Sequence, residues 1–426
     1  MDKKNTQKRG FDYTYVIVGS MFLMIFVTLG FCSSNRSLYL SPITEALGIK
    51  RSLFSIGDSC RYITTAVINV FFGALLQKFG TRKLLGAGFL SLIITMLCYA
   101  FSETVVGFYV GGVFLGLGLA WTTTTMIGSI VSRWCKGNRG TVMGMILAAN
   151  GVGSALATQI VTPIIYEAGN PFGYRNAYKL IAVILAVTGV IILSLYREKP
   201  SEDGAQSAGK AKKKSRGVTW VGISMTEASR KPYFYMALAC IFFTGLVLQG
   251  ITSVAAAHMK DVGLDAAYVA TVLSVHSLAL SGFKFLMGFF YDRFGLRTTM
   301  TICDVSSLIV MVLLSSITAS PLGKVLAIAY GVMSSAALPL ETIMLPLYAG
   351  DLFGEKQFNK FLGLVVSVNT AGYALGSPIF NAVFDKTGTY NSIFIVCAGI
   401  MAVVTVVTQI VITSAQRERK LLSENA

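Results

Sequence analysis

The chain has 426 residues, of which 54% are hydrophobic and only 13% are charged. Soluble globular proteins carry about 25% charged residues, so this composition excludes an ordinary soluble domain. The formal net charge at pH 7 is +16. In a soluble chain such a charge would suggest a nucleic-acid partner, so the placement of the positive residues along the chain decides what the charge means.

Apolar segments long enough to cross a bilayer recur along the whole chain, since about 20 helical residues span the hydrocarbon core. We count twelve such segments, near 14–40, 53–76, 84–101, 105–131, 141–166, 177–196, 233–257, 267–290, 299–318, 323–349, 361–383 and 391–413. The first is too long for a cleaved signal peptide, and no small-residue cleavage site follows it. We expect one long helix there, running to about Ala46. The pattern predicts an all-α protein that crosses a membrane many times.

The positive charge gathers on one side of the predicted membrane. When the termini and every second loop are assigned to one side, that side holds 26 of the 36 Lys and Arg residues and the other side holds 7. The remaining three, Arg36, Arg61 and Lys284, lie inside predicted helices. For a protein of the cell membrane, the positive-inside rule then places both termini on the cytoplasmic side. This distribution explains the net charge without a nucleic-acid partner.

Two sequence motifs occur twice, once in each half of the chain. "GALLQKFGTRK" follows the second predicted helix and "GFFYDRFGLR" follows the eighth, at an offset of 215 residues. "NGVGSAL" from Asn150 and "NTAGYAL" from Asn369 match at an offset of 219. The halves therefore look like copies of one six-helix unit. We expect bundles at 1–196 and 232–426, joined by a cytoplasmic linker at 197–231 that is rich in Lys, Ser and Gly.

The first repeated motif resembles the G-x-x-x-D-R-x-G-x-R signature of the major facilitator superfamily. The resemblance implies twelve transmembrane helices in two pseudo-symmetric six-helix bundles, around a cavity that opens alternately to each side. It also implies a conformational latch, in which glycines let helices approach and Asp and Arg tie helix ends together. The first copy departs from the signature, because Gln77 occupies the acidic position. The latch candidates are Gly73, Lys78, Gly80, Arg82, Gly288, Asp292, Arg293, Gly295 and Arg297.

Within the superfamily, "NRSLYLSPITEALGI" from Asn35 resembles the end of the first helix in the monocarboxylate and oxalate/formate transporter branch. The resemblance implies that Arg36 and Lys284 bind a substrate carboxylate. Leu280 stands where the animal-type proteins have an aspartate, so their scheme of proton coupling does not carry over intact. The lysine that oxalate-type proteins place in the eleventh helix is also replaced, near Asn369.

Elementary electrostatics supports the same site. An arginine within hydrocarbon costs about 2.5 kcal/mol or more unless it faces protein or water. A carboxylate between Arg36 and Lys284, which belong to opposite halves, would offset the desolvation of both cations. The alternative is that each cation pairs with a protein acid or extends toward the membrane surface. Arg61 lies three residues after Asp58, so a structural pair between them competes with substrate binding by Arg61.

Four further residues carry open alternatives. Buried amides such as Asn150 and Asn369 either bind substrate or join helices. Glu341, between two prolines, could carry a proton or form a fixed salt bridge. His276 lies two turns before Lys284 and is a second proton-coupling candidate, although a hydrogen-bonded packing role is the expectation for it.

The sequence contains no Ser/His/Asp set, metal-ligand cluster or phosphate-binding loop, and its seven cysteines form no CxxC pair. We therefore expect no enzyme, no cofactor and no metal. The sequence predicts a monomeric secondary active transporter of a small organic anion, with a monocarboxylate as the preferred candidate. The anion would cross the lipid bilayer with a proton or in exchange for another anion. The alternatives are an exporter of neutral or cationic molecules and a non-transporting membrane sensor on the same fold.

Overall fold

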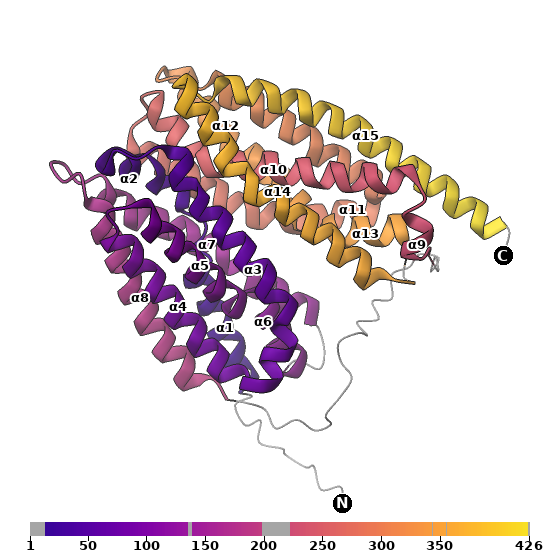
Figure 1. Cartoon of the computed structure of the whole chain (residues 1–426), viewed down its shortest axis with the longest axis horizontal. Coiled ribbons are helices and arrows are strands. Elements are labelled where there is room, and N and C mark those ends of the chain that lie inside the picture. The colour runs from indigo at the N-terminus through magenta and orange to yellow at the C-terminus, as the bar shows by residue number, and fades with distance from the viewer. Residues whose placement is uncertain (1–12, 135–138, 198–221, 343, 355, 425–426) are drawn as a thin grey trace, which may run out of the picture.

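The computed structural model consists of two helical bundles that meet at one end and diverge at the other (Figure 1). It describes residues 13–134, 139–197, 222–342, 344–354 and 356–424. Most of the predicted linker, 198–221, lies outside these residues.

Helices form almost all of the described chain. The N-terminal bundle contains α1 (Thr14–Thr28), η1 (Arg36–Tyr39), α2 (Leu40–Leu47), α3 (Arg51–Phe79), α4 (Thr81–Phe101), α5 (Val105–Thr122), α6 (Thr124–Trp134), α7 (Arg139–Ile165) and α8 (Gly173–Leu195). The C-terminal bundle contains α9 (Met225–Ala228), α10 (Pro232–Asp261), α11 (Ala266–Ser316), α12 (Pro321–Ala337), η2 (Leu338–Glu341), α13 (Met344–Phe353), α14 (Phe358–Thr387) and α15 (Asn391–Glu424).

The twelve predicted membrane segments are all present. Ten helical stretches of the described residues are long and apolar enough to cross a membrane. One of them, α11, joins two predicted segments across a kink at Gly295, where φ is 77° and the backbone is not helical. The first predicted segment supplies the twelfth, through α1 and the turns that follow it. The twelve-helix, two-bundle fold is confirmed.

The expectation of one continuous first helix to about Ala46 is wrong. Helix α1 ends at Thr28, and turns occupy the chain up to the short helix η1 at Arg36. Gly30 explains the break, because the turning backbone there lies directly against α7 and a Cβ atom would clash with the backbone of Gly153. The Asn35 amide donates a hydrogen bond of 3.1 Å to the Gly30 carbonyl and fixes the turn. The break places Arg36 at the start of a new, differently directed helix.

The second repeated motif holds its glycine in the same environment in both bundles. A Cβ atom at Gly153 of α7 would clash with the Phe26 carbonyl of α1. A Cβ atom at Gly372 of α14 would clash in the same way with the Phe242 carbonyl of α10. The motif therefore marks one close helix crossing that each bundle repeats.

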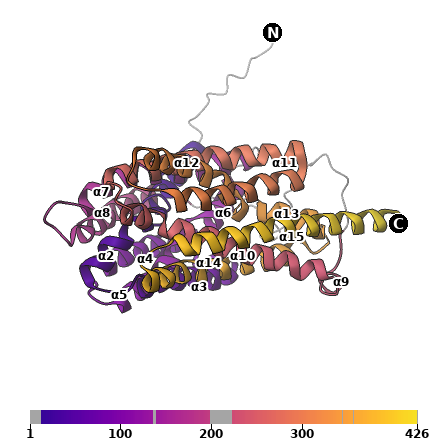
Figure 2. The ribbon, with the colours of Figure 1, turned by 90° about the horizontal axis from the view of Figure 1, so that it is seen from above.

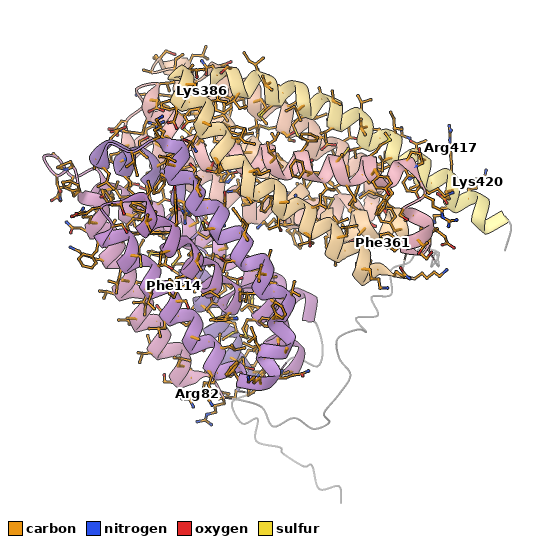
Figure 3. The ribbon with its side chains drawn as sticks, in the orientation of Figure 1. Arg82, Phe114, Phe361, Lys386, Arg417 and Lys420 are labelled. Atoms are coloured by element: carbon orange, nitrogen blue, oxygen red, sulfur yellow. The ribbon has the colours of Figure 1, made fainter. Side chains whose placement is uncertain are left out.

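The bundles touch mainly through two helix pairs on opposite sides of the molecule, α3 with α14 and α7 with α11 (Figure 2), and α10 also contacts η1 and α2. The contacts gather around α2 and the turn between α14 and α15, near Lys386, which we call the closed end (Figure 3). At the opposite, open end the bundles splay apart and carry Arg82, Arg417 and Lys420 (Figure 3).

Arg51, the first residue of α3, links the two bundles at the closed end. Its Nη2 donates to Asp261 Oδ1 of α10 at 2.7 Å, and its Nη1 donates to the Tyr390 hydroxyl at 3.2 Å. The guanidinium also lies 3.9 Å from the centre of the Phe384 ring. A bidentate pair that is also stacked on an aromatic ring fixes the geometry of the contact.

Asp385 of the C-terminal bundle caps a helix of the N-terminal bundle. Its carboxylate accepts hydrogen bonds from the backbone N–H groups of Arg51 and Ser52, at 3.1 and 3.0 Å. These are the first residues of α3, whose own N-cap residue, Lys50, provides no side-chain hydrogen bond. The cap satisfies unpaired N–H groups and places negative charge at the positive end of the helix dipole. Both bundles must stay together at the closed end for this cap to exist.

Candidate functional site

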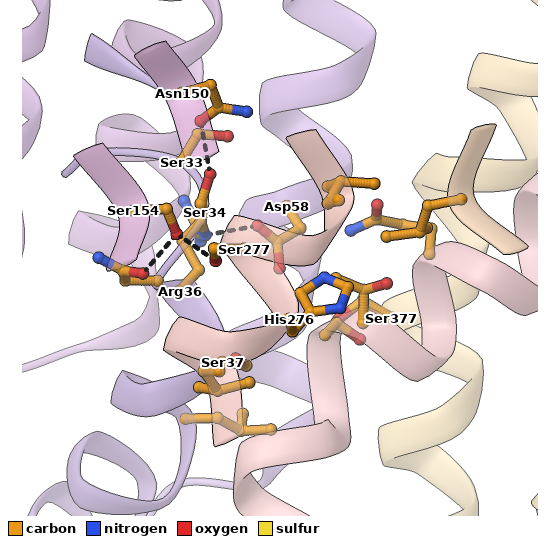
Figure 4. Close-up of a pocket in the computed structure, with 18 of the residues that line it drawn as sticks. Ser33, Ser34, Arg36, Ser37, Asp58, Asn150, Ser154, His276, Ser277 and Ser377 are labelled. Atoms are coloured by element: carbon orange, nitrogen blue, oxygen red, sulfur yellow. Dashed lines mark hydrogen bonds and ion pairs between the residues drawn. The ribbon is translucent and has the colours of Figure 1, made fainter. Parts of the chain in front are cut away.

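A cavity of about 280 Å³ lies between the two bundles. Its walls come from the turns after α1, η1, α3 and α7 on one side, and from α10, α11, α12 and α14 on the other. The Ser154 and Ser277 hydroxyls lie 2.9 Å apart and join α7 to α11 at its wall (Figure 4). This position, between the bundles and below the closed end, is where superfamily transporters hold their substrates.

Among the charged residues of the described lining, cations outnumber carboxylates. Arg36, Arg61 and Lys284 are cations, and Asp58 is a carboxylate, so the formal net charge of the described lining is +2 with His276 neutral. Hydroxyl and amide side chains from both bundles, such as Ser33, Gln249 and Ser377, form much of the remaining wall.

Arg36 lies at the cavity and is paired with a protein acid. Its Nε lies 2.7 Å from Asp58 Oδ1, and the two side chains are only 16% and 11% exposed. Its Nη1 donates a hydrogen bond of 2.9 Å to the Tyr99 hydroxyl of α4. Figure 4 shows the Arg36 and Asp58 side chains meeting between η1 and α3. Arg36 therefore lines the cavity, as predicted, and it also has a protein acid as partner, which was the alternative.

The expected structural pair between Asp58 and Arg61 is wrong. The Arg61 guanidinium instead lies over the Tyr62 ring, 4.3 Å from its centre, and donates a hydrogen bond of 2.9 Å to the Tyr62 hydroxyl. The physical reason is that the break in the first helix buries Arg36 beside Asp58. Arg61 lines the same cavity, and its guanidinium is held by Tyr62.

Lys284 and His276 reach the cavity from α11. The His276 Nδ1 atom lies 2.8 Å from the Ser334 hydroxyl and 3.2 Å from the Ser335 hydroxyl of α12. This confirms the expected hydrogen-bonded packing role for His276, although the ring also forms part of the wall (Figure 4). Leu280 lies between them in the sequence and lines the cavity as well, so α11 presents Lys284 with an apolar residue one turn before it.

The two repeated asparagines have different roles. Asn150 lines the cavity, and its Oδ1 accepts a hydrogen bond of 3.0 Å from Ser34 in the broken first helix. Asn369 is 2% exposed, donates to the Ile241 carbonyl of α10 at 3.3 Å and is absent from the described lining. Of the two open alternatives, Asn369 therefore joins helices, and we withdraw it from the substrate-binding set.

Glu341 ends η2, but its side chain lies outside the described residues. Its neighbours Leu338 and Thr342 line the cavity, so the backbone of η2 forms part of the wall. The prediction that Glu341 carries a proton remains a prediction.

The latch motif has the same backbone in both copies. Gly80 and Gly295 occupy matching positions with φ values of 78° and 77°, a region that favours glycine. Arg297 Nε donates a hydrogen bond of 3.0 Å to Gln409 Oε1, which ties α11 to α15. Lys78 lies over Phe79 at 5.4 Å, and Arg293 lies over Phe294 at 5.7 Å, in the same place within each copy.

Two expectations for the latch do not hold in this conformation. A Cβ atom at Gly73 or Gly288 would meet nothing within 4 Å, so neither glycine sits at a close helix crossing. Asp292 forms no salt bridge with any residue that the structure describes. Both copies of the motif lie toward the open end, where the bundles are apart (Figure 1).

Within the described residues, no group of three or more His, Cys, Asp or Glu side chains is arranged to hold a metal ion. The site is therefore described by its charged, hydroxyl and amide groups. A charged cavity between two similar helical bundles is the architecture of a membrane transport protein.

Comparison with known proteins gives the family: the chain belongs to the Major Facilitator Superfamily, whose model matches residues 21–257 and 237–425. Monocarboxylate transporter 13 of Bos taurus is 27% identical over 337 residues, covering 77% of this chain and 73% of the relative. The oxalate:formate antiporter of Oxalobacter formigenes is 22% identical over 374 residues, covering 85% and 83%. The crystal structure of the nucleoside transporter NupG has a TM-score of 0.74 at 14% identity and covers 94% of this chain and 99% of that one. The protein is a membrane transporter and not an enzyme.

Proposed function

We propose that this protein is a secondary active transporter that works by alternating access. Its proposed substrates are small organic anions, with monocarboxylates as the preferred class. The observation that carries the proposal is the net charge of +2 on the described cavity lining. The relatives named for monocarboxylates and for oxalate and formate support the same class of substrate.

The charge argument rests on the described lining as a whole. Its described carboxylate, Asp58, pairs with Arg36, and the described charged side chains together leave the lining positive. Positive charge at the centre of a membrane protein is costly unless an anion or water compensates it. A carboxylate in the cavity lowers this cost, and it does so best when it contacts both bundles.

Alternating access follows from where these cations lie. Arg36 and Arg61 belong to the N-terminal bundle, and Lys284 belongs to the C-terminal bundle. An anion held between them favours the conformation that brings the bundles together, because a ligand shifts an equilibrium toward the state it binds better. The bundles then rock around the substrate as two halves of a monomeric chain.

The positive-inside rule gives the direction of the open end. Arg82, Arg417 and Lys420 lie at that end (Figure 3), and both termini belong to the same side by the distribution of Lys and Arg. In the cell membrane this end faces the cytoplasm, so the structure is the inward-facing conformation. Energy comes from proton symport or from exchange for another anion.

A second class of substrate has one observation in its favour. The hydroxyl and amide groups of the lining, among them Ser37, Asn150, Gln249 and Ser377, suit a neutral solute that carries several hydroxyl groups. The positive lining favours an anion over such a solute, so the transport experiment must include both.

The test is exchange in proteoliposomes that contain the purified protein. Vesicles are loaded with unlabelled solute, and entry of labelled lactate, pyruvate, oxalate, gluconate and uridine is measured at equal pH on both sides. We expect exchange of at least one of the four acids and none of uridine. Exchange of uridine without any of the acids would overturn the anion assignment.

A further inference from the structure

Asp58 is the one carboxylate among the described residues that line the cavity. It lies on α3 with 11% of its side chain exposed, and its Oδ1 contacts Arg36 Nε at 2.7 Å. The pair occupies the same guanidinium that the proposed substrate needs. A substrate carboxylate and Asp58 therefore compete for Arg36.

The competition has a large electrostatic cost when both carboxylates are ionised. Two like charges 4 Å apart repel by about 4 kcal/mol at an effective dielectric constant of 20. The cost disappears when one of the two acids is protonated. We propose that Asp58 is the proton-coupling residue of this transporter: it takes up one proton when the substrate carboxylate replaces it on Arg36. This inference rests on the proposed function.

The groups that face Asp58 are cationic, imidazole, phenolic or thiol groups. Those that interact with it electrostatically are Arg36 of η1, Cys60 beside it on α3, Tyr99 of α4 and Tyr178 of α8, with Arg61 one turn further along α3 and His276 and Lys284 across the cavity on α11. Among the residues that the structure describes, this set contains no second carboxylate. One substrate therefore couples to one proton at this place.

Asp58 fits the role better than the other described acids near the bundle centres. Asp304 is 1% exposed in the second half of α11 and is absent from the described lining. Asp261 and Asp385 hold the closed end through Arg51 and through the N-terminus of α3. Asp58 alone among these four contacts a cation at the cavity wall.

The transport cycle balances in charge and in protons. A proton from the outer solution binds an Asp58 carboxylate oxygen, the ion pair with Arg36 breaks, and the substrate carboxylate takes its place. After the bundles rock, the substrate leaves to the cytoplasm, Asp58 releases its proton to water there, and the pair with Arg36 forms again. One proton and one monocarboxylate cross together, so the step is electroneutral.

The experiment compares wild type with Asp58→Asn, which mimics the protonated acid. Glu103→Gln is the matched control, because Glu103 also pairs with an arginine, Arg175 at 3.8 Å, but lies outside the cavity. Two quantities are measured for the acid of the four-acid panel that wild type exchanges fastest. They are exchange at equal pH, and accumulation driven by a pH gradient with the membrane voltage clamped by valinomycin and potassium.

We expect Asp58→Asn to lower gradient-driven accumulation at least tenfold relative to its own exchange at equal pH. Wild-type affinity should weaken by about tenfold per pH unit once Asp58 is ionised, as one linked proton requires, whereas the affinity of the Asn variant should not change with pH. Glu103→Gln should match wild type in all three measurements.

Several results would overturn the inference. Gradient-driven accumulation by Asp58→Asn would overturn it. Loss of exchange in a folded Asp58→Asn protein would also overturn it, since Asp58 would then serve binding alone. Wild type that exchanges an acid without response to a pH gradient would overturn the inference and leave the proposed function standing. Wild type that exchanges none of the four acids would overturn both.

A second measurement needs no variant. Wild-type protein in weakly buffered detergent solution, above the pH at which Asp58 ionises, should take up about one proton for each anion it binds, as read by a pH indicator. Binding without proton uptake would contradict the role of Asp58, whatever the folding of the Asn variant.

Discussion

Arg36 organises the centre of the N-terminal bundle through two contacts, the ion pair with Asp58 and the hydrogen bond to the Tyr99 hydroxyl. The guanidinium also lies 5.4 Å from the centre of the Tyr99 ring. Tyr99 therefore orients Arg36 while Asp58 neutralises it. A side chain held by two partners can change one of them without losing its place.

The first prediction concerns this orientation. Tyr99→Phe keeps the ring and removes the hydroxyl that accepts from Arg36, so it should lower the free energy of unfolding by about 1.5–3 kcal/mol, the range for a hydrogen bond to a charged group. Thermal unfolding in detergent measures the change. Tyr109→Phe is the control, because its hydroxyl donates to a neutral carbonyl, that of Leu53, in an exposed place. Equal effects of the two variants would mean that Arg36 does not depend on Tyr99.

The second prediction separates Asp58 from the two proton carriers that the sequence suggests. His276→Gln and Glu341→Gln should each keep accumulation driven by a pH gradient, because we propose Asp58 as the residue that carries the coupled proton. His276→Gln should lower thermal stability, since the ring contacts the Ser334 and Ser335 hydroxyls. Loss of accumulation with intact exchange in either variant would move the coupling site to that residue.

At the level of single residues, the sequence predicted which side chains reach the cavity better than it predicted their partners. Arg36, Lys284 and Asn150 were recognisable because polar groups inside apolar segments need a reason to be there. The pairing of Arg36 with Asp58 depends on the direction of the chain after the break in the first helix. No spacing along one helix encodes it, whereas the spacing of Asp58 and Arg61 suggested a pair that does not form.

At the level of helices, close crossings decide where the polar groups lie. Gly153 brings α7 against α1 next to the break, and Gly372 brings α14 against α10 in the other bundle. The repeated motifs showed that these positions correspond. They did not show the break itself, because the residues from Thr28 to Ser34 are apolar or small and continue the composition of a membrane helix.

The third prediction tests the crossing. Gly153→Ala adds a methyl group against the Phe26 carbonyl and should destabilise the protein by about 1–3 kcal/mol, the usual cost of an overpacked core. Gly372→Ala should cost a similar amount at the equivalent crossing. Gly19→Ala in α1 is the control, because a Cβ atom there meets nothing within 4 Å. Thermal unfolding of the three variants gives the answer, and an unchanged Gly153→Ala protein would contradict a tight crossing.

For the whole molecule, hydrophobicity predicted the twelve helices, charge bias predicted their orientation, and the repeated motifs with the family resemblance predicted two bundles. These features act over whole segments, so a few misplaced residues do not change them. The closed end was not predictable in the same way. Arg51 and Asp385 fall outside the predicted membrane segments, so the sequence suggests only charged loop residues there. The packed bundles show that Arg51 contacts Asp261 and that Asp385 caps α3.

The fourth prediction concerns this closed end. Asp385→Asn weakens a cap that crosses between bundles, so it should shift the conformational equilibrium toward opening there. Spin labels at positions 45 and 387, in a protein whose native cysteines are replaced, report the separation by electron–electron resonance. We expect a longer and broader distance distribution than in the labelled parent. Asp265→Asn is the control, because Asp265 caps α11 within its own bundle; an equal change in both variants would contradict a role in bundle closure.

The central claim is that one substrate carboxylate contacts cations of both bundles, and a double-mutant cycle on binding affinity tests it most directly. The cycle is made in Asp58→Asn, so that removal of the Arg36 charge leaves no buried carboxylate unpaired, with Lys324→Gln as a lysine control outside the cavity. Arg36→Gln and Lys284→Gln should each weaken binding by about 10- to 150-fold, equivalent to 1.5–3 kcal/mol. The double variant should be non-additive, because one ligand couples the two sites, and Lys284→Arg should retain part of the affinity. Near-parent affinity in either folded single variant would contradict the claim and place the anion elsewhere.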